Sequence, residues 1–256
     1  MIALLSPAKT LDLSPLERQV EPSLPALLDQ SEELVEVSRQ LTAADLMRLM
    51  KISKSLATLN VRRFQEFRTP FTPNNAKPCI FAFRGDTYVG FDADTLETEA
   101  LDFAQQHVRI LSGLYGLLRP FDLMQPYRLE MGIKLATSRG KDLYGFWGSR
   151  VTEAIQSALG EQGDACVVNL ASNEYIKVVK REQLKARFVD CVFKEVRGIV
   201  ARVVGMSAKR ARGMMARFIC EHRIHRVEQL KEFDSAGYQF KPDASTDDVL
   251  EFHRAA

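Results

Sequence analysis

The segment from Leu111 to Gly148 combines the residue types of a ligand-binding surface. Glycine occurs six times in it, and Pro120 and Pro126 interrupt any helix, because proline lacks a backbone N–H and its ring clashes with the preceding turn. Aromatic residues alternate with cations, whereas a packed core shows aliphatic residues at every second position or at helical spacing. The segment fits a surface for an anionic or planar ligand and fits a tight connector between strands equally well.

A helix expected from Ser207 to Arg223 separates cations from apolar residues. At about 100° per residue, five cations fall within an arc of about 160°. They are Lys209, Arg210, Arg212, Arg217 and Arg223. Arginine binds phosphate through two parallel hydrogen bonds and lysine acts as a point charge, so phosphates are the natural counterpart of this face. A solvated face is the alternative, but it normally interleaves glutamates, and only Glu221 does so here.

The residues from Leu46 to Leu59, LMRLMKISKSLATL, match the spacing of a helix-hairpin-helix. Lys51 and Ser53 stand where the usual hairpin glycines let backbone N–H groups approach a phosphate. Side chains would have to supply those contacts instead. The candidates are Lys51, Ser53, Lys54, Arg62 and Arg63. An ordinary helix pair is the alternative interpretation.

Lys9 follows a short expected strand over residues 2–5. The sequence SPAKT resembles a phosphate-binding loop only in its Lys-Thr ending, and the absence of both glycines excludes a nucleotide triphosphatase. At the carboxyl end of a strand, Lys9 can still face a crevice. We predict that the fold gathers a cluster of cations there: Lys9, Arg119, Arg128, Lys134, Lys141 and Lys177.

Signatures of catalysis and of metal binding are weak. His222 and His225 lie three residues apart but beside arginines, which disfavours a divalent cation, so we predict no metal and no cofactor. Ser6, Ser112 and Ser172 have no base nearby, so no nucleophile is evident. A general acid–base pair could come from four acids, although acids among many cations more often orient arginines. They are Asp122, Glu130, Asp142 and Glu174. The sequence therefore favours a binding protein over an enzyme.

The four cysteines indicate packing rather than redox chemistry. Each lies in an apolar stretch, and no two form a C-x-x-C pair: Cys79, Cys166, Cys191 and Cys220. A peroxide sensor needs an exposed thiolate of low pKa with a resolving partner. We predict four buried, unreactive thiols.

Charge is unevenly distributed along the 256 residues, although the net charge is only +2. From Lys177 to Lys231 there are fifteen Lys and Arg against five Asp and Glu, whereas the remainder holds 20 basic and 28 acidic residues. Such a division favours a polyanionic partner. No apolar run approaches the roughly 20 residues that cross a bilayer, and the first residues do not resemble a signal peptide. We expect a cytoplasmic protein without a membrane or an obligate protein partner.

The candidate binding residues must be positioned by strands and helices that alternate along the chain. Strands are expected at 2–5, 79–84, 87–91, 165–170, 188–193 and 199–204, and in the final VLEFHR. Helices are expected at 24–40, after a Thr42 cap, at 99–109, at 172–178 and from Ser207, with a loop over 68–78. We predict one α/β domain over residues 1–256, with a mixed β-sheet flanked by helices.

Several long motifs together resemble the YaaA family of peroxide-stress proteins. They are SPAKTLD (6–12), LSGLYGLLRPFDLMQPYRLEMG (111–132), GKDLYGFWG (140–148), NLASNEY (169–175) and KRARGMMARFI (209–219). The resemblance implies a mixed α/β fold containing a helix-hairpin-helix-like element, at about 42–64 in this chain. It also implies a DNA-binding role in resistance to hydrogen peroxide.

The leading hypothesis is a DNA-binding protein of the hydrogen-peroxide stress response that holds phosphates with a basic surface. Tyr115, Tyr127, Tyr144, Phe146 and Trp147 would favour distorted or single-stranded DNA, because unpaired bases stack on aromatic rings. The alternative is an enzyme acting on a nucleotide or nucleic acid through a pocket in the Gly-aromatic segment. A closed cleft holding Glu130 or Glu174 beside cations would favour the enzyme.

Overall fold

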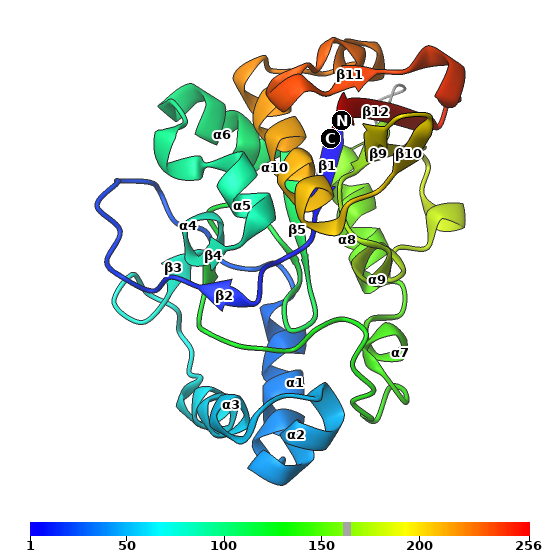
Figure 1. The fold of residues 1–256 in the computed structure, drawn as a ribbon. Coiled ribbons are helices and arrows are strands. Elements are labelled where there is room, and N and C mark those ends of the chain that lie inside the picture. The colour runs from blue at the N-terminus through cyan, green and yellow to red at the C-terminus, as the bar shows by residue number, and fades with distance from the viewer. Residues whose placement is uncertain (161–164) are drawn as a thin grey trace.

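The computed structural model, which describes residues 1–160 and 165–256, is built around an eight-stranded sheet (Figure 1). The strand order is β11–β12–β9–β8–β1–β5–β6, and β10 pairs with β9. The parallel strands are β1 (Ile2–Leu5), β5 (Val108–Ser112), β8 (Cys166–Asn169), β9 (Arg187–Arg197) and β12 (Val249–Ala255). The antiparallel strands are β6 (Gly116–Leu118), β10 (Val200–Arg202) and β11 (Gln239–Phe240). The predicted mixed sheet is confirmed.

Strand β1 lies at the centre of this sheet because it is apolar on both faces. Its sequence IALL is fully buried, and Ala3 is paired with Val108 of β5 on one side and with Val168 of β8 on the other. Parallel strands covered on both faces read as continuous apolar runs. Strand β9 instead alternates buried and partly exposed residues, so that only one face is fully covered.

Helices flank the sheet. Helix α10 (Gly205–Glu221) packs against β9 and β1 and against α5 (Asp86–Phe91) and α6 (Thr98–His107), whereas α8 (Arg150–Leu159) packs against β6 and β1. The contact between α10 and α5 is backbone to backbone. A Cβ atom added to Gly213 would lie 1.8 Å from the Thr87 carbonyl oxygen, and one added to Gly90 would lie 2.1 Å from the Arg210 carbonyl oxygen. Only glycine permits this approach.

Three helices form a lobe at one end of the molecule: α1 (Leu28–Arg39), α2 (Ala43–Met50) and α3 (Lys54–Glu66) (Figure 1). The predicted Thr42 cap is confirmed, since the Asp45 N–H donates to Thr42 Oγ1 at 3.2 Å and the Thr42 N–H donates to Asp45 Oδ2 at 2.9 Å. The predicted helix at 24–40 begins only at Leu28, because Pro25 keeps the preceding residue extended.

Shorter elements complete the fold. Strand β2 (Thr10–Leu11) pairs with β4 (Phe83–Arg84), and β3 (Lys77–Pro78) pairs with β7 (Leu123–Met124). The remaining short helices are α4 (Cys79–Ala82), α7 (Leu143–Trp147) and α9 (Asn173–Ile176). Turns of 3₁₀ helix are η1 (Ala93–Thr95), η2 (Arg181–Gln183), η3 (Val227–Glu232), η4 (Ser235–Gly237) and η5 (Pro242–Ala244).

The predicted hairpin of strands at 79–84 and 87–91 is wrong. Helix α4, the two residues of β4 and helix α5 occupy these positions. The run CIFA is buried on every side. A short apolar run with no exposed face carries no periodicity that could tell a strand from a helix.

The Gly-aromatic segment is mostly core. Tyr115, Phe146 and Trp147 are fully buried, and Trp147 Nε1 donates to the Gly113 carbonyl at 3.0 Å. Of the five rings expected to stack on bases, only Tyr144 is more than slightly exposed. The glycines let the chain turn these rings inward, so for the aromatics the interpretation as a tight connector holds.

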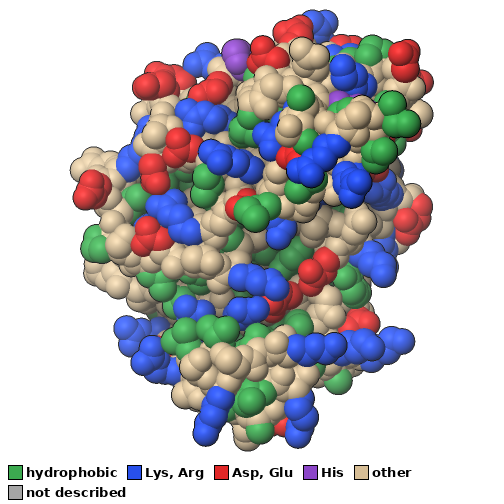
Figure 2. Space-filling view, in the orientation of Figure 1, with side chains coloured by type: hydrophobic (Ala, Val, Ile, Leu, Met, Phe, Trp, Pro, Cys, Tyr) green, Lys and Arg blue, Asp and Glu red, His purple; other side chains and the backbone are tan. Residues whose placement is uncertain are grey.

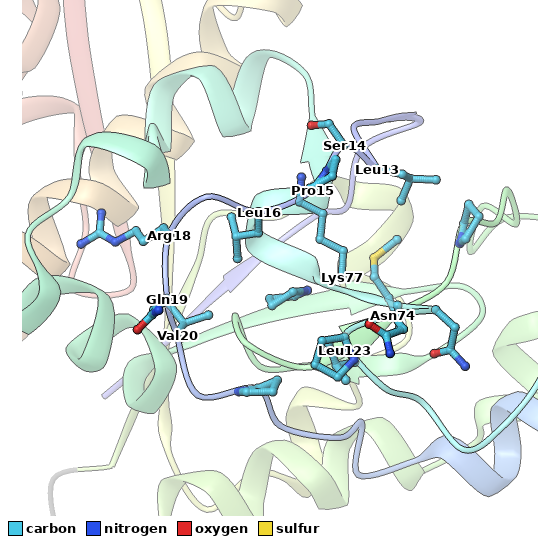
Figure 3. Close-up of a pocket in the computed structure, with 17 residues that line it drawn as sticks. Leu13, Ser14, Pro15, Leu16, Arg18, Gln19, Val20, Asn74, Lys77 and Leu123 are labelled. Atoms are coloured by element: carbon cyan, nitrogen blue, oxygen red, sulfur yellow. The ribbon is translucent and has the colours of Figure 1, made fainter.

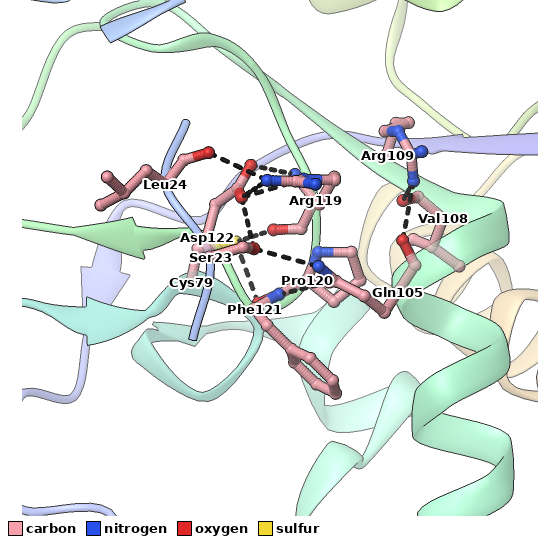
Figure 4. Close-up of polar contacts among 10 residues, drawn as sticks. All are labelled: Ser23, Leu24, Cys79, Gln105, Val108, Arg109, Arg119, Pro120, Phe121 and Asp122. Carbon is pink, nitrogen blue, oxygen red and sulfur yellow. Dashed lines mark hydrogen bonds and ion pairs between the residues drawn. The ribbon is translucent and has the colours of Figure 1, made fainter. Parts of the chain in front are cut away.

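Asp122 joins this segment to the chain that leads into α1 (Figure 4). Its carboxylate, which is 1% exposed, accepts from Ser23 Oγ at 2.6 Å, the Arg119 N–H at 2.7 Å and Arg119 Nε at 3.1 Å. Arg119 Nη2 also donates to the Leu24 carbonyl at 3.0 Å. Burial raises the pKa of Asp122, and these donors oppose that shift. Arg119 therefore serves the fold and does not join Lys9.

Candidate functional site: a cation-lined waist and a crevice beside it

A hollow with Lys and Arg side chains on both sides separates the helical lobe from the body of the molecule (Figure 2). We call it the waist and define it by Lys9, Arg63, Arg128, Glu130 and Lys177. Glu130 Oε1 lies 3.1 Å from Lys9 Nζ and 3.1 Å from Arg128 Nη2. Of the six cations expected to cluster, Lys9 and Arg128 are thus brought to the same buried carboxylate.

Arg63 approaches this group from α3. Burial lowers the pKa of Arg63, and the neighbouring guanidinium groups of Arg62 and Arg128 lower it further. Within residues 1–160 and 165–256, the Arg63 side chain has no ion pair or hydrogen bond. Two positive groups meet here where only Arg128 has an acid beside it. Such a pair is a favourable place for a phosphate.

Lys177 directly follows α9, whose Glu174 contacts the chain two residues beyond Glu130. Its ammonium lies 5.9 Å from the centre of the Tyr144 ring, and the Tyr144 hydroxyl donates to the Glu174 carbonyl at 2.7 Å. Glu174 Oε1 in turn accepts from the Gly132 N–H at 3.0 Å. Lys134 and Lys141 are exposed on the same connecting segment, and the described residues contain no acid within ion-pair distance of either.

Of the predicted hairpin residues, Lys51 and Ser53 lie in the exposed turn between α2 and α3, and the other three lie within α3. Lys51 has a left-handed backbone, and Ser53 Oγ caps α3 by accepting from the Leu56 N–H at 3.4 Å. Lys51, Lys54 and Arg62 are exposed, and Arg62 lies 3.8 Å from Glu66. The two helices and their short connection therefore exist, while their use as a DNA-binding hairpin stays a prediction.

The basic face predicted for α10 is divided. Lys209 and Arg210 are exposed, but Arg212 and Arg217 are partly buried. Arg217 Nη1 donates to the Asp92 carbonyl and to Thr95 Oγ1, both at 2.9 Å, and Arg217 Nη2 lies 2.8 Å from Glu221. The close packing of α5 on α10 brings these partners to Arg217. We therefore do not assign it to a phosphate-binding surface.

A crevice lies where the chain leaves β1 and β8. The connection after β1 leads to β5 on one side, and the connection after β8 leads to β9 on the other. Adjacent parallel strands with diverging connections leave a crevice at their carboxyl ends, the usual ligand site of open α/β sheets. We call it the switch-point crevice; its volume is about 610 Å³. Its walls include Ser6–Thr10, Arg84–Tyr88, Ser172–Tyr175 and the first two turns of α10 as far as Arg212.

Two serines fasten the loops that form this crevice. Ser6 Oγ accepts from the Ser172 N–H at 2.9 Å and donates to Ser172 Oγ at 3.3 Å, and the Tyr88 hydroxyl donates to the Ser6 carbonyl at 3.0 Å. Sequence reasoning missed Arg84 and Asp86, because their segment was expected to be a hairpin turn. Ser6 and Ser172 carried a usable signal, since each follows the end of a buried strand.

A larger cavity, of about 780 Å³, lies beneath the strap of residues 13–22 (Figure 3). Its walls are mostly apolar or proline, and its two charged residues already have partners. Lys77 Nζ lies 4.0 Å from Asp12 Oδ1, and Arg18 Nη1 donates to the Asp94 carbonyl at 3.4 Å. This cavity therefore has no charged side chain without a partner among the described residues. The switch-point crevice does, because the buried Nε atom of Arg212 has none.

The described part of the chain contains no cluster of metal-ligating residues and no exposed cysteine. No group of three His, Cys, Asp or Glu residues there is placed to hold a metal ion. All four cysteines are buried, as predicted, and burial raises the pKa of each thiol, that of Cys166 to about 11. No helix in the described residues is long and apolar enough to span a membrane.

The cysteines should therefore react slowly in the native protein. A pKa of about 11 for Cys166 leaves a thiolate fraction about 10²-fold below that of a free thiol at neutral pH, before steric protection is counted. We expect slow labelling by a disulfide reagent in buffer and rapid reaction of all four thiols in urea. Rapid oxidation of a single thiol in the folded protein would contradict this prediction.

The mixed sheet, the helical lobe, the cation-lined waist and the switch-point crevice together describe an α/β protein. The chain belongs to the family of the peroxide stress protein YaaA, whose model matches residues 1–244. It is 52% identical over 246 residues to a UPF0246 protein of Shewanella pealeana, covering 96% of both chains. It is 50% identical over 254 residues to a UPF0246 protein of Alteromonas mediterranea, covering 99% of this chain and 98% of the relative. The predicted family resemblance is confirmed.

Proposed function

We propose that this member of a peroxide-stress family acts by binding DNA, with phosphates held in the waist and the α2–α3 hairpin as a second contact. The observation that carries the proposal is Arg63, which is partly buried beside Arg128 with no acid of its own. Partial burial of a cation that lacks an opposite charge is unfavourable, and a bound phosphate relieves it. Lys9 and Lys177 extend the positive surface on the body of the molecule.

The waist fits double-stranded or distorted DNA better than a stacked single strand, since the rings that could stack on unpaired bases are buried. Phosphate contacts position a duplex without reading its sequence. We therefore expect binding with weak sequence preference and a strong dependence on salt.

Lys177→Glu and Lys54→Glu test the waist and the hairpin separately. Each reversal should weaken the affinity for a duplex about tenfold or more at low salt and reduce the slope of log affinity against log salt by about 1 to 2. Lys54 is the first residue of α3, where a glutamate suits the helix dipole, so weaker binding by Lys54→Glu cannot be attributed to a damaged fold. Fluorescence anisotropy with duplex, bulged and single-stranded probes at several salt concentrations measures these effects.

Lys231→Glu is the matched control, because this exposed lysine lies in η3 beside β11, at the opposite end of the molecule from the helical lobe. It should leave the affinity unchanged. If Lys54→Glu binds normally and Lys177→Glu does not, the hairpin contact is wrong and the waist stands. Normal binding by both variants would refute the DNA-binding surface altogether.

A further inference from the structure

The strongest unexplained group outside the waist is Arg212 in the switch-point crevice. Its Nε atom is buried and has no hydrogen-bond partner within the described residues. Burial lowers the pKa of Arg212, and no carboxylate contributes to that shift. Arg212 is partly buried, and a guanidinium with a buried N–H group that makes no hydrogen bond is unfavourable unless something satisfies it. On the wall of a cavity, such a cation is a favourable place for an anion.

The surroundings of Arg212 suit a phosphate. The exposed Lys209 lies one turn earlier on α10 and lines the same crevice. Gly205, the first residue of this 17-residue helix, also lines it, and the first turn carries no acidic residue. No side chain caps this helix, so its first N–H groups stay available for an anion. Two cations and the positive end of a long helix therefore meet on one wall.

The crevice also has acceptors. Asp86 and Glu174 line the crevice, and neither has an ion-pair partner in the part of the chain that the structure describes. Carboxylates there would repel a second phosphate but accept hydrogen bonds from hydroxyl or amino groups. The volume of about 610 Å³ lies within the range of small-molecule sites. A ligand that combines one phosphate with several hydrogen-bond donors fits this lining.

We propose that the switch-point crevice binds a nucleoside monophosphate. Its phosphate contacts Arg212, Lys209 and the start of α10, and its ribose hydroxyls or base amino group donate to Asp86 and Glu174. This site is separate from the DNA contacts of the waist, although Lys9 borders both.

Thermal unfolding of the full chain with a panel of nucleoside monophosphates, checked by calorimetric titration, tests the proposal. Arg212→Met keeps the length of the side chain and removes its charge. We expect at least one monophosphate to raise the Tm of the unmodified protein, and Arg212→Met to weaken its Kd at least tenfold. Because the variant no longer has a guanidinium whose Nε is buried without a partner, its own Tm without ligand should be higher than that of the unmodified protein.

Arg210→Met is the matched control, since Arg210 lies on the same helix but does not line this crevice. It should bind the nucleotide normally, and Arg212→Met should bind duplex DNA with unchanged affinity. Three results would each overturn the proposal: no Tm shift with any nucleotide at millimolar concentration, an equal shift with inorganic phosphate alone, or normal nucleotide binding by Arg212→Met. None of these results bears on Lys177 or Lys54, so the DNA-binding proposal stands or falls separately.

Discussion

Replacing Gly213 by alanine should lower the free energy of unfolding by about 3 kcal/mol or more. The new Cβ atom would lie 1.8 Å from the Thr87 carbonyl oxygen and 2.8 Å from the Phe91 nitrogen. Both are backbone atoms, which cannot swing aside as a flexible side chain can. Helices α5 and α10 would have to separate, and their contact forms one wall of the switch-point crevice. Urea unfolding should show a lower midpoint with an unchanged slope.

Gly205→Ala, in the same helix, is the control for this prediction. A Cβ atom added at Gly205 meets nothing within 4 Å, so alanine should stabilise the protein by about 0.4 to 1 kcal/mol through the unfolded chain. Opposite signs for the two variants would show that packing against α5 decides the outcome. Equal effects would show that the loss at Gly213 is not a matter of packing.

Asp122→Ala should lower the free energy of unfolding by about 3 to 5 kcal/mol. The substitution removes an almost completely buried carboxylate and leaves the Arg119 N–H, the Arg119 guanidinium and the Ser23 hydroxyl without their acceptor. Because this network fixes the chain that enters α1, the helical lobe should also become more susceptible to proteolysis. Limited proteolysis and urea unfolding of the same variant measure both effects.

Two further variants give smaller expected losses of stability, with which the loss after Asp122→Ala can be compared. Ser23→Ala removes one donor to Asp122 and the acceptor of Gln105 Nε2, and should cost about 1 to 2 kcal/mol. Asp102→Ala removes an exposed carboxylate of α6 that has no ion pair or hydrogen bond within the described residues, and should change stability by less than about 0.5 kcal/mol. A loss after Asp122→Ala no larger than that after Ser23→Ala would contradict the role of Asp122 in joining the two segments.

Elements with a distinctive hydrophobic or capping pattern could be predicted from the sequence. The apolar run of β1 fixes a strand buried on both faces, and Thr42 with Asp45 fixes the start of α2. The helix expected over Ser207 to Arg223 is present as α10, which begins two residues earlier, at Gly205, and ends at Glu221, before Arg223 takes a left-handed backbone. At residues 79–84 the same reasoning was wrong, because an apolar run that is buried on every side has no period to detect.

Whether a cation is paired or available depends on side chains and carbonyl groups that only the fold brings next to it. Arg119 and Arg128 lie in one segment, but Asp122 holds the first in the fold and Glu130 brings the second to Lys9. Helical angles placed Arg217 on a cationic face without showing that α5 brings the Asp92 carbonyl and Thr95 against it. The site therefore had to be found from tertiary contacts.

The central position of β1 determines when the sheet can form during synthesis of the chain. Residues 2–5 emerge from the ribosome well before their partners on the two sides, which begin at Val108 and Cys166. The segment IALL must therefore stay unpaired while more than a hundred further residues are synthesised, exposing an apolar strand that is prone to aggregate. The α2–α3 pair, whose contacts are local, can form long before that. The newly made chain thus carries a folded helical lobe while its sheet is still missing the strands on either side of β1.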